Sequence, residues 1–111
     1  GDRVRAVVQG VCSLGCDRIC PVGSLHGELN ALPEEVREAV RAFDRDYLAT
    51  YTRWFAQGRD RGELTFTGDP GAVAACFAGI KQASLQRQRS NPDEPARQSL
   101  DQFLRLVGID P

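Results

Sequence analysis

Cysteines recur at every fourth position near the start of the chain. Cys12, Cys16 and Cys20 follow one another at this interval, and His26 comes six residues after the last of them. If a helix runs through the cysteines, their sulfurs lie along one face, because residues i and i+4 are neighbours on a helix. Three sulfurs and an imidazole would make a chemically sensible zinc set, and reactive thiols could act as a redox sensor.

Other features favour a structural role for these cysteines. Free cysteine is among the most buried side chains, and the usual structural zinc site takes its ligands from paired, more closely spaced cysteines. Pro21 also indicates that a helix ends at Cys20, which would move this sulfur off the row. We expect buried thiols in a reducing compartment and no metal ion. A cysteine-based redox or metal sensor that uses Cys12, Cys16, Cys20 and His26 is the alternative hypothesis.

Aromatic side chains form a second group with the chemistry of a binding site. They recur every three or four residues, as Phe43, Tyr47, Tyr51, Trp54 and Phe55. Such a row is the normal way in which a helix buries one face in a core. Aromatic walls with a few polar groups also hold mid-sized organic ligands, and the tyrosine hydroxyls and the indole N–H could supply directional hydrogen bonds. The pattern therefore predicts either a core face or the wall of a pocket.

Catalytic motifs are missing from the sequence. It contains no nucleophile elbow, no glycine loop that would cradle a phosphate, and no paired-histidine motif on a helix. Nothing places Cys20 and His26 at a helix amino terminus, where a thiolate would be stabilised. We predict that the protein is not an enzyme and needs no cofactor.

Length and charge set the frame for these groups. The chain has 111 residues, of which 41% are hydrophobic, and this predicts a single domain over residues 1–111. Its 14 basic and 15 acidic residues give a net charge of −1, and the basic ones are scattered, unlike a nucleic-acid-binding surface. No window resembles a membrane span or the apolar core of a signal peptide. We expect a cytoplasmic protein that does not bind a membrane.

Helical periodicity dominates the chain, and we find no strand pattern. The sequence predicts an all-α fold with helices over 2 to about 15, 25 to about 30, 33 to about 61, 70 to about 89, and 96 to 107. Ser24 and Asp69 are expected N-caps, and Pro70 suits a first helical turn. Gly62 and Gly108 are expected to end the helices that precede them.

The predicted helix over 70–89 has two apolar sides. Val73, Phe77 and Ile80 make one side. The other consists mainly of small residues, which let a second backbone come close, and it comprises Ala75, Ala78, Gly79, Gln82 and Leu85. With the last helix it could form half of a four-helix bundle across a two-fold axis. The alternative is that this second side packs inside one chain.

The order of these elements resembles the ligand-sensing domain of tetracycline-repressor (TetR) family transcription factors from about Cys16 onward. Cys20-Pro21-Val22-Gly23-Ser24-Leu25, with Glu28-Leu29 behind it, opens the matching block. The block continues through the long helix that closes with Gly58, through Arg61-Gly62-Glu63-Leu64, and to the helix start at Asp69-Pro70. The amino-terminal helix-turn-helix with which such regulators grip DNA is absent from this sequence.

The resemblance implies a homodimeric effector-binding domain of a bacterial regulator, expected to be a repressor. Its cavity for a small hydrophobic or aromatic effector would lie beneath the long helix, lined by Cys16, Val22, Leu25, Tyr47, Tyr51, Trp54 and Phe77. Its dimer interface would be formed by the final two helices, through Ala75, Ala78, Gly79, Gln82, Leu85, Leu100, Phe103, Leu104 and Val107. DNA would be contacted only through the absent domain. A freestanding helical interaction module is a further alternative.

Overall fold

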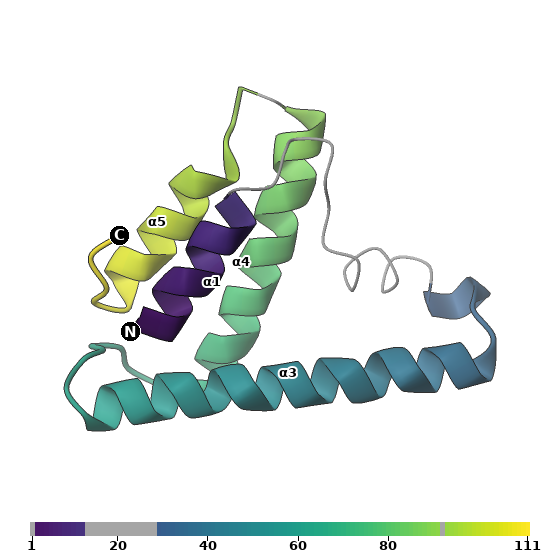
Figure 1. Cartoon of the computed structure of the whole chain (residues 1–111), viewed down its shortest axis with the longest axis horizontal. Helices are drawn as coiled ribbons and strands as arrows, with labels where there is room; N and C mark the ends of the chain where they lie inside the picture. Colours follow the sequence, from purple (N-terminus) through teal and green to yellow (C-terminus); the bar gives the residue numbers. More distant parts are fainter. Residues whose placement is uncertain (1, 13–28, 92) are drawn as a thin grey trace.

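The computed structural model describes residues 2–12, 29–91 and 93–111, and every regular element in these segments is helical. The elements are α1 (Asp2–Cys12), the 3₁₀-helix η1 (Leu29–Ala31), α3 (Glu34–Asp60), α4 (Pro70–Ser90) and α5 (Ala96–Leu106) (Figure 1). The predicted all-α fold is confirmed. Most of the short helix expected over 25–30, including its cap Ser24, lies outside the described residues. None of the described helices is long and apolar enough to span a bilayer.

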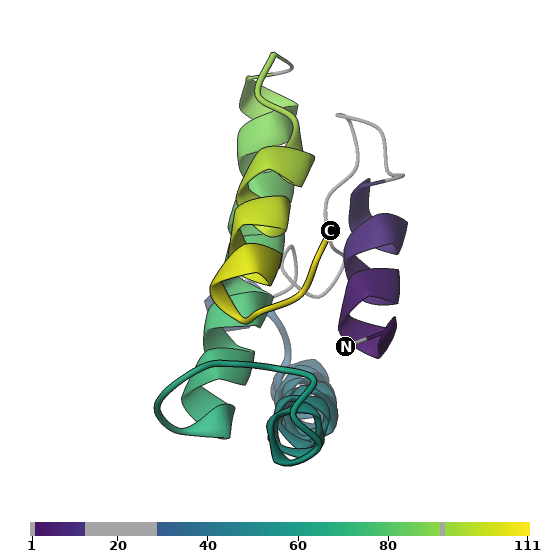
Figure 2. The same ribbon diagram turned by 90° about the vertical axis from the view of Figure 1, so that its left-hand side faces the viewer.

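The helices form two groups. α1, α4 and α5 stand side by side, and α3 crosses beneath them (Figure 1). In the view turned by 90°, α3 is seen end-on, and α1 lies on the opposite side of the molecule from the overlapping α4 and α5 (Figure 2). With 27 residues, α3 is roughly 40 Å long. Its first half therefore extends beyond the other three helices (Figure 1).

The helix boundaries follow from local chemistry. Asp69 caps α4, because its Oδ2 accepts a hydrogen bond of 3.0 Å from the backbone N–H of Ala72, and Pro70 occupies the first turn. Gly62 and Gly108, just beyond α3 and α5, have φ values of +76° and +84°. Glycine adopts this left-handed conformation without steric cost, which is why these positions end the helices as predicted.

Three phenylalanine rings from different helices join in the core. Phe77 of α4 stacks on Phe103 of α5 at 5.3 Å between centroids, and Phe55 of α3 lies 5.8 Å from the first and 6.0 Å from the second. α1 adds two buried valines, Val4 and Val8. The fold is thus held by apolar contacts among segments far apart in sequence, which stabilise in proportion to the area removed from water.

Burial is uneven along the long helix α3. Tyr51 and Phe55 in its second half are buried. Val36 and Phe43 in its first half are 39% and 55% exposed. Val40 in the same half is buried, so the apolar face is covered there at some positions and exposed at others, where the helix extends past α1, α4 and α5 (Figure 1).

Candidate ligand-binding site

Four of the predicted pocket residues come together on α3 and α4. Tyr51 is the centre of the group: its ring lies 5.1 Å from Tyr47, 5.4 Å from Trp54 and 5.1 Å from Phe77, measured between centroids. Tyr47, Tyr51 and Trp54 are three or four residues apart on α3, so they share one face of that helix. Cys16, Val22 and Leu25, the other predicted pocket residues, lie outside the described residues.

The four rings differ in burial. Phe77 is completely buried and Tyr51 is 7% exposed, and both belong to the hydrophobic core. Tyr47 and Trp54 are only partly buried and pack against that core from its edge. The inner rings of the aromatic row thus belong to the core, and Tyr47 and Trp54 lie at its edge.

Two polar side chains of α4 contact the tyrosine hydroxyls. The Lys81 ammonium donates a hydrogen bond of 2.9 Å to Tyr51 Oη, and the Gln82 amide donates one of 3.3 Å to Tyr47 Oη. Lys81 Nζ also lies 5.1 Å from the ring centroids of both Tyr47 and Tyr51. A cation at this distance from aromatic rings is attracted by them. The site therefore combines an aromatic surface with a positive charge. We call Tyr47, Tyr51, Trp54, Phe77, Lys81 and Gln82 the aromatic wall.

Lys81 was not selected from the sequence as a site residue. A signal for it exists, because Phe77, Lys81 and Leu85 are spaced by four and must lie on one face of α4. Since Phe77 and Leu85 are core residues, a lysine between them is directed toward the interior. A charged residue inside an apolar row is the feature that should have drawn attention.

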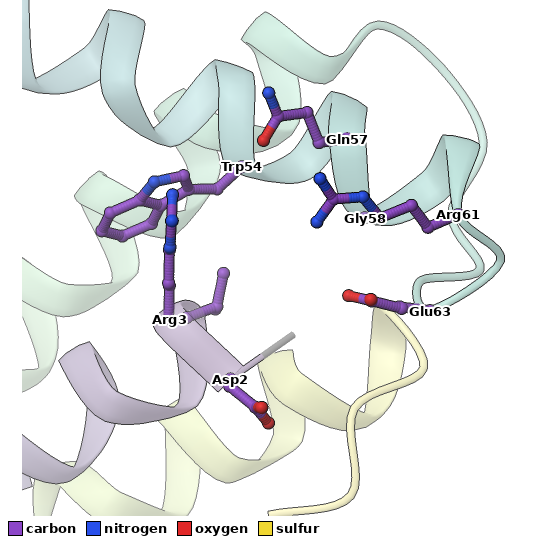
Figure 3. Close-up of a pocket in the computed structure, with 8 residues that line it drawn as sticks. Asp2, Arg3, Trp54, Gln57, Gly58, Arg61 and Glu63 are labelled. Carbon is purple, nitrogen blue, oxygen red and sulfur yellow. The ribbon is translucent and has the colours of Figure 1, made fainter.

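A small polar hollow lies between the start of α1 and the end of α3, next to Trp54. Its volume is about 200 Å³, below the range of roughly 300–1,000 Å³ that is typical of ligand pockets. Arg3 lies beside the Trp54 ring, with its guanidinium carbon 5.9 Å from the centroid, and Asp2, Arg61 and Glu63 surround the opening (Figure 3). This charged lining does not suit the hydrophobic effector expected from the sequence.

The residues predicted for a dimer interface fall into two groups. Most of them are buried within the single chain, namely Ala78, Leu85, Leu100, Phe103, Leu104 and Val107. For Ala78 and Leu85 of α4, burial within one chain is the alternative that the sequence left open. Gln82 is half-buried against Tyr47. Ala75 and Gly79 are exposed on α4.

Small side chains make up a continuous exposed surface on α4. They follow one another at helical spacing and comprise Ala72, Ala75, Cys76, Gly79 and Ala83, which we call the small-residue strip. Next to it lies a groove between α4 and α5 whose lining includes Ile80 and Leu106. Leu106 itself is 66% exposed. The exposed surface of α4 and α5 therefore carries small and apolar side chains at the strip and at Leu106, next to the polar residues Gln98, Ser99 and Gln102 that also line the groove.

Of the four cysteine side chains, the structure describes that of Cys76. Cys76 is a free, exposed thiol within the small-residue strip. Cys16, Cys20 and His26 lie outside the described residues, and the side chain of Cys12 is not described. Among residues 2–12, 29–91 and 93–111, no three histidine, cysteine, aspartate or glutamate side chains form a group that could hold a metal ion. The redox or metal-sensor hypothesis thus stays untested.

Comparison with known proteins identifies the family of this chain. The family described as "Tetracyclin repressor-like, C-terminal domain" matches residues 2–104. The transcriptional regulator AcuR of Cereibacter sphaeroides is 30% identical over 105 residues, which cover 94% of this chain and 46% of that protein. The chain thus spans about half the length of this relative. No solved structure matches it. The chain belongs to the TetR family of transcriptional regulators and corresponds to the C-terminal domain of such a protein.

Proposed function

We propose that this domain senses a small hydrophobic or aromatic effector and joins two copies of a bacterial repressor. The observation that carries the sensing function is the aromatic wall, where partly buried rings lie beside polar groups that could orient a ligand. Family membership supports this assignment, since the family consists of transcriptional regulators. The domain would act in the cytoplasm without catalysing a reaction, and DNA would be contacted by a helix-turn-helix domain outside these residues.

Effector binding would act through the position of α3 relative to α4. The two helices share the aromatic wall, since Tyr47 and Tyr51 come from α3 and their hydrogen-bond donors Lys81 and Gln82 come from α4. A ligand inserted against these side chains would favour one spacing of the helices over another. Each 1.4 kcal/mol of preference changes the ratio of the two conformations about tenfold. Release of the operator would follow from this shift.

Ligand binding to the aromatic wall can be tested on the 111-residue chain. Small organic compounds are screened for a rise in melting temperature, and those that bind are titrated while the emission of Trp54 is recorded. Trp54 is the only tryptophan, and its ring is 5.4 Å from that of Tyr51, so its emission reports on the site. Tyr47→Ala should weaken binding at least about tenfold, since it removes a ring and a hydroxyl from the wall.

The matched control for Tyr47→Ala is Phe66→Ala. Phe66 is also a partly buried aromatic residue packed against the core, but its neighbours are Phe55 and Arg59, away from the wall. The Phe66→Ala variant should bind the same compounds with unchanged affinity. The proposal fails if no compound stabilises the chain, or if both variants lose binding equally.

We propose further that the outer surface of α4 and α5 forms the dimer interface. The small-residue strip would let two α4 helices approach closely, and Leu106 would be removed from water on association. This assignment keeps the predicted Ala75 and Gly79. It uses exposed residues of α4 and α5 in place of the other predicted residues, which are the buried Ala78, Leu85, Leu100, Phe103, Leu104 and Val107 and the half-buried Gln82.

Sedimentation equilibrium tests this interface. Leu106→Glu places a charge in the proposed contact, and it should convert the dimer into a monomer because an unpaired buried charge is strongly unfavourable. Val36→Glu is the control, since Val36 is exposed on the far half of α3 and should not affect association. A wild-type chain that sediments as a monomer at all concentrations would contradict the proposal, as would a Leu106→Glu variant that remains dimeric.

A further inference from the structure

Lys81 is the only lysine in the chain, and it is buried. Its exposed fraction is 9%, and it lies between Phe77 and Leu85 on the inner face of α4. Lysine is almost never buried to this extent unless its charge is paired, because removing an ammonium group from water is costly. The question is therefore what compensates the charge of Lys81.

The contacts of Lys81 compensate it only in part. An ammonium group has three donor hydrogens, and one of them is used in the bond to Tyr51 Oη. The rings of Tyr47 and Tyr51 attract the cation but carry no net charge. Within residues 2–12, 29–91 and 93–111, the ion pairs are made by arginines, and no carboxylate lies within ion-pair distance of Lys81.

We infer that Lys81 is the counter-ion of the effector, and that the effector is a monocarboxylate with an apolar body. This inference rests on the proposed sensing function and names the ligand class for the same site. A carboxylate beside Lys81 would supply the negative charge that the described neighbours of Lys81 lack. The partly buried rings of Tyr47 and Trp54 would contact the rest of the molecule.

The chemistry of the neighbouring groups favours a carboxylate over a phosphate. Lys81 supplies one positive charge, which matches one carboxylate, whereas phosphate sites usually combine several cations or a helix amino terminus. Tyr51 Oη accepts its hydrogen bond from Lys81, so its own hydroxyl hydrogen can be donated to a carboxylate oxygen. Two donors, Lys81 and Tyr51, then converge on one anionic group.

Matched pairs of acids and amides test this inference on the 111-residue chain. The probes are acetate, butyrate, phenylacetate and benzoate, each compared with its neutral amide, which has nearly the same shape. Binding is followed by the melting temperature and by the emission of Trp54. We expect at least one carboxylate to bind the wild-type chain and its amide to bind at least about thirtyfold more weakly, as for loss of one partner of a buried charge pair.

Variants at Lys81 separate recognition of the anion from a structural role. Lys81→Met keeps the length of the side chain and removes the charge, so carboxylate binding should fall about thirtyfold or more. The melting temperature of the free variant should stay equal or rise, because a buried charge without a counter-charge has been removed. Lys81→Arg should retain part of the affinity. The control, Arg89→Met, removes an exposed charge from the same helix and should bind like the wild type.

Three outcomes would overturn the inference. The first is that none of the carboxylates binds the wild-type chain, and the second is that each carboxylate binds no more tightly than its amide. The third is that Lys81→Met binds the carboxylate as tightly as the wild type does. If amides or other neutral compounds bind at the aromatic wall while carboxylates do not, the anion assignment fails and the sensing function stands. If neither class of compound binds, both proposals fail.

Discussion

Replacement of Gly79 by alanine tests the proposed dimer through the sign of its effect. Gly79 is exposed and lies near the middle of the length of α4, and a Cβ atom built there meets no neighbouring heavy atom within 4 Å. Within one chain, alanine therefore brings no steric cost and stabilises the helix by about 0.5–1 kcal/mol. For a domain of this size, that corresponds to a rise of about 2–8 °C in melting temperature.

Association of two α4 helices reverses this expectation. Gly79 lies near the middle of the small-residue strip, between Ala75 and Ala83, where the two backbones would come closest. An added methyl group in a tightly packed contact costs about 1–3 kcal/mol, which exceeds the gain in helix propensity. We therefore predict that Gly79→Ala weakens dimerisation, although each separate chain becomes more stable.

The assay compares Gly79→Ala with Gly10→Ala. Gly10 is an exposed glycine in α1, and a Cβ atom there also meets nothing within 4 Å. Melting temperatures are measured at low and high protein concentration, together with the dissociation constant from sedimentation equilibrium. Gly10→Ala should raise the melting temperature at both concentrations. If Gly79→Ala does the same and leaves the dissociation constant unchanged, the small-residue strip is not the interface.

Three further predictions concern the fold that supports the site. Phe55→Ala should lower the free energy of unfolding by about 3–5 kcal/mol in urea denaturation, whereas Phe43→Ala, on an exposed part of the same helix, should change it by less than about 0.5 kcal/mol; similar losses would contradict the observed burial. Gly108→Ala should lower the melting temperature more than Gly62→Ala: both glycines have positive φ, at a cost of about 1–2 kcal/mol for alanine, but only at position 108 would the added Cβ clash with Oγ1 of Thr65. Gln88→Leu should cost about 1–3 kcal/mol, since the first backbone amide of α5 loses its acceptor at 2.8 Å, and unchanged hydrogen exchange at that amide would refute this.

Local signals in the sequence predicted the helices well. Asp69, Pro70, Gly62 and Gly108 act through their own backbone and nearest neighbours, so their effects can be read without knowledge of the fold. The capping of α5 by Gln88 could not be predicted in this way. The donor and acceptor of that bond come from different helices, and only the packing of α4 against α5 brings them together.

Which side of α4 is buried depends on the helices that pack against it. Tyr47, Tyr51 and Trp54 share a face because of helix geometry alone, and this part of the candidate site was predicted. The two apolar sides of α4 were recognised, but periodicity does not tell which residues a single chain covers. In the structure Leu85 is inside and Gly79 is outside.

The contacts of the Lys81 ammonium also could not be predicted from helical periodicity. A lysine is normally assigned to a solvated surface, and only its position relative to α3 shows that the ammonium lies 5.1 Å from the centroids of two tyrosine rings. The residue on which the further inference depends was therefore the one that composition-based reasoning passed over.

The most direct test of the sensing function is the location of a bound effector. The compound that stabilises the 111-residue chain most is bound to isotope-labelled protein, and intermolecular nuclear Overhauser effects are measured to the aromatic protons. We predict contacts from the compound to the rings of Tyr47 and Tyr51. Contacts confined to another surface, such as the charged hollow around Arg3 and Glu63, would contradict a sensor built on the aromatic wall of α3 and α4.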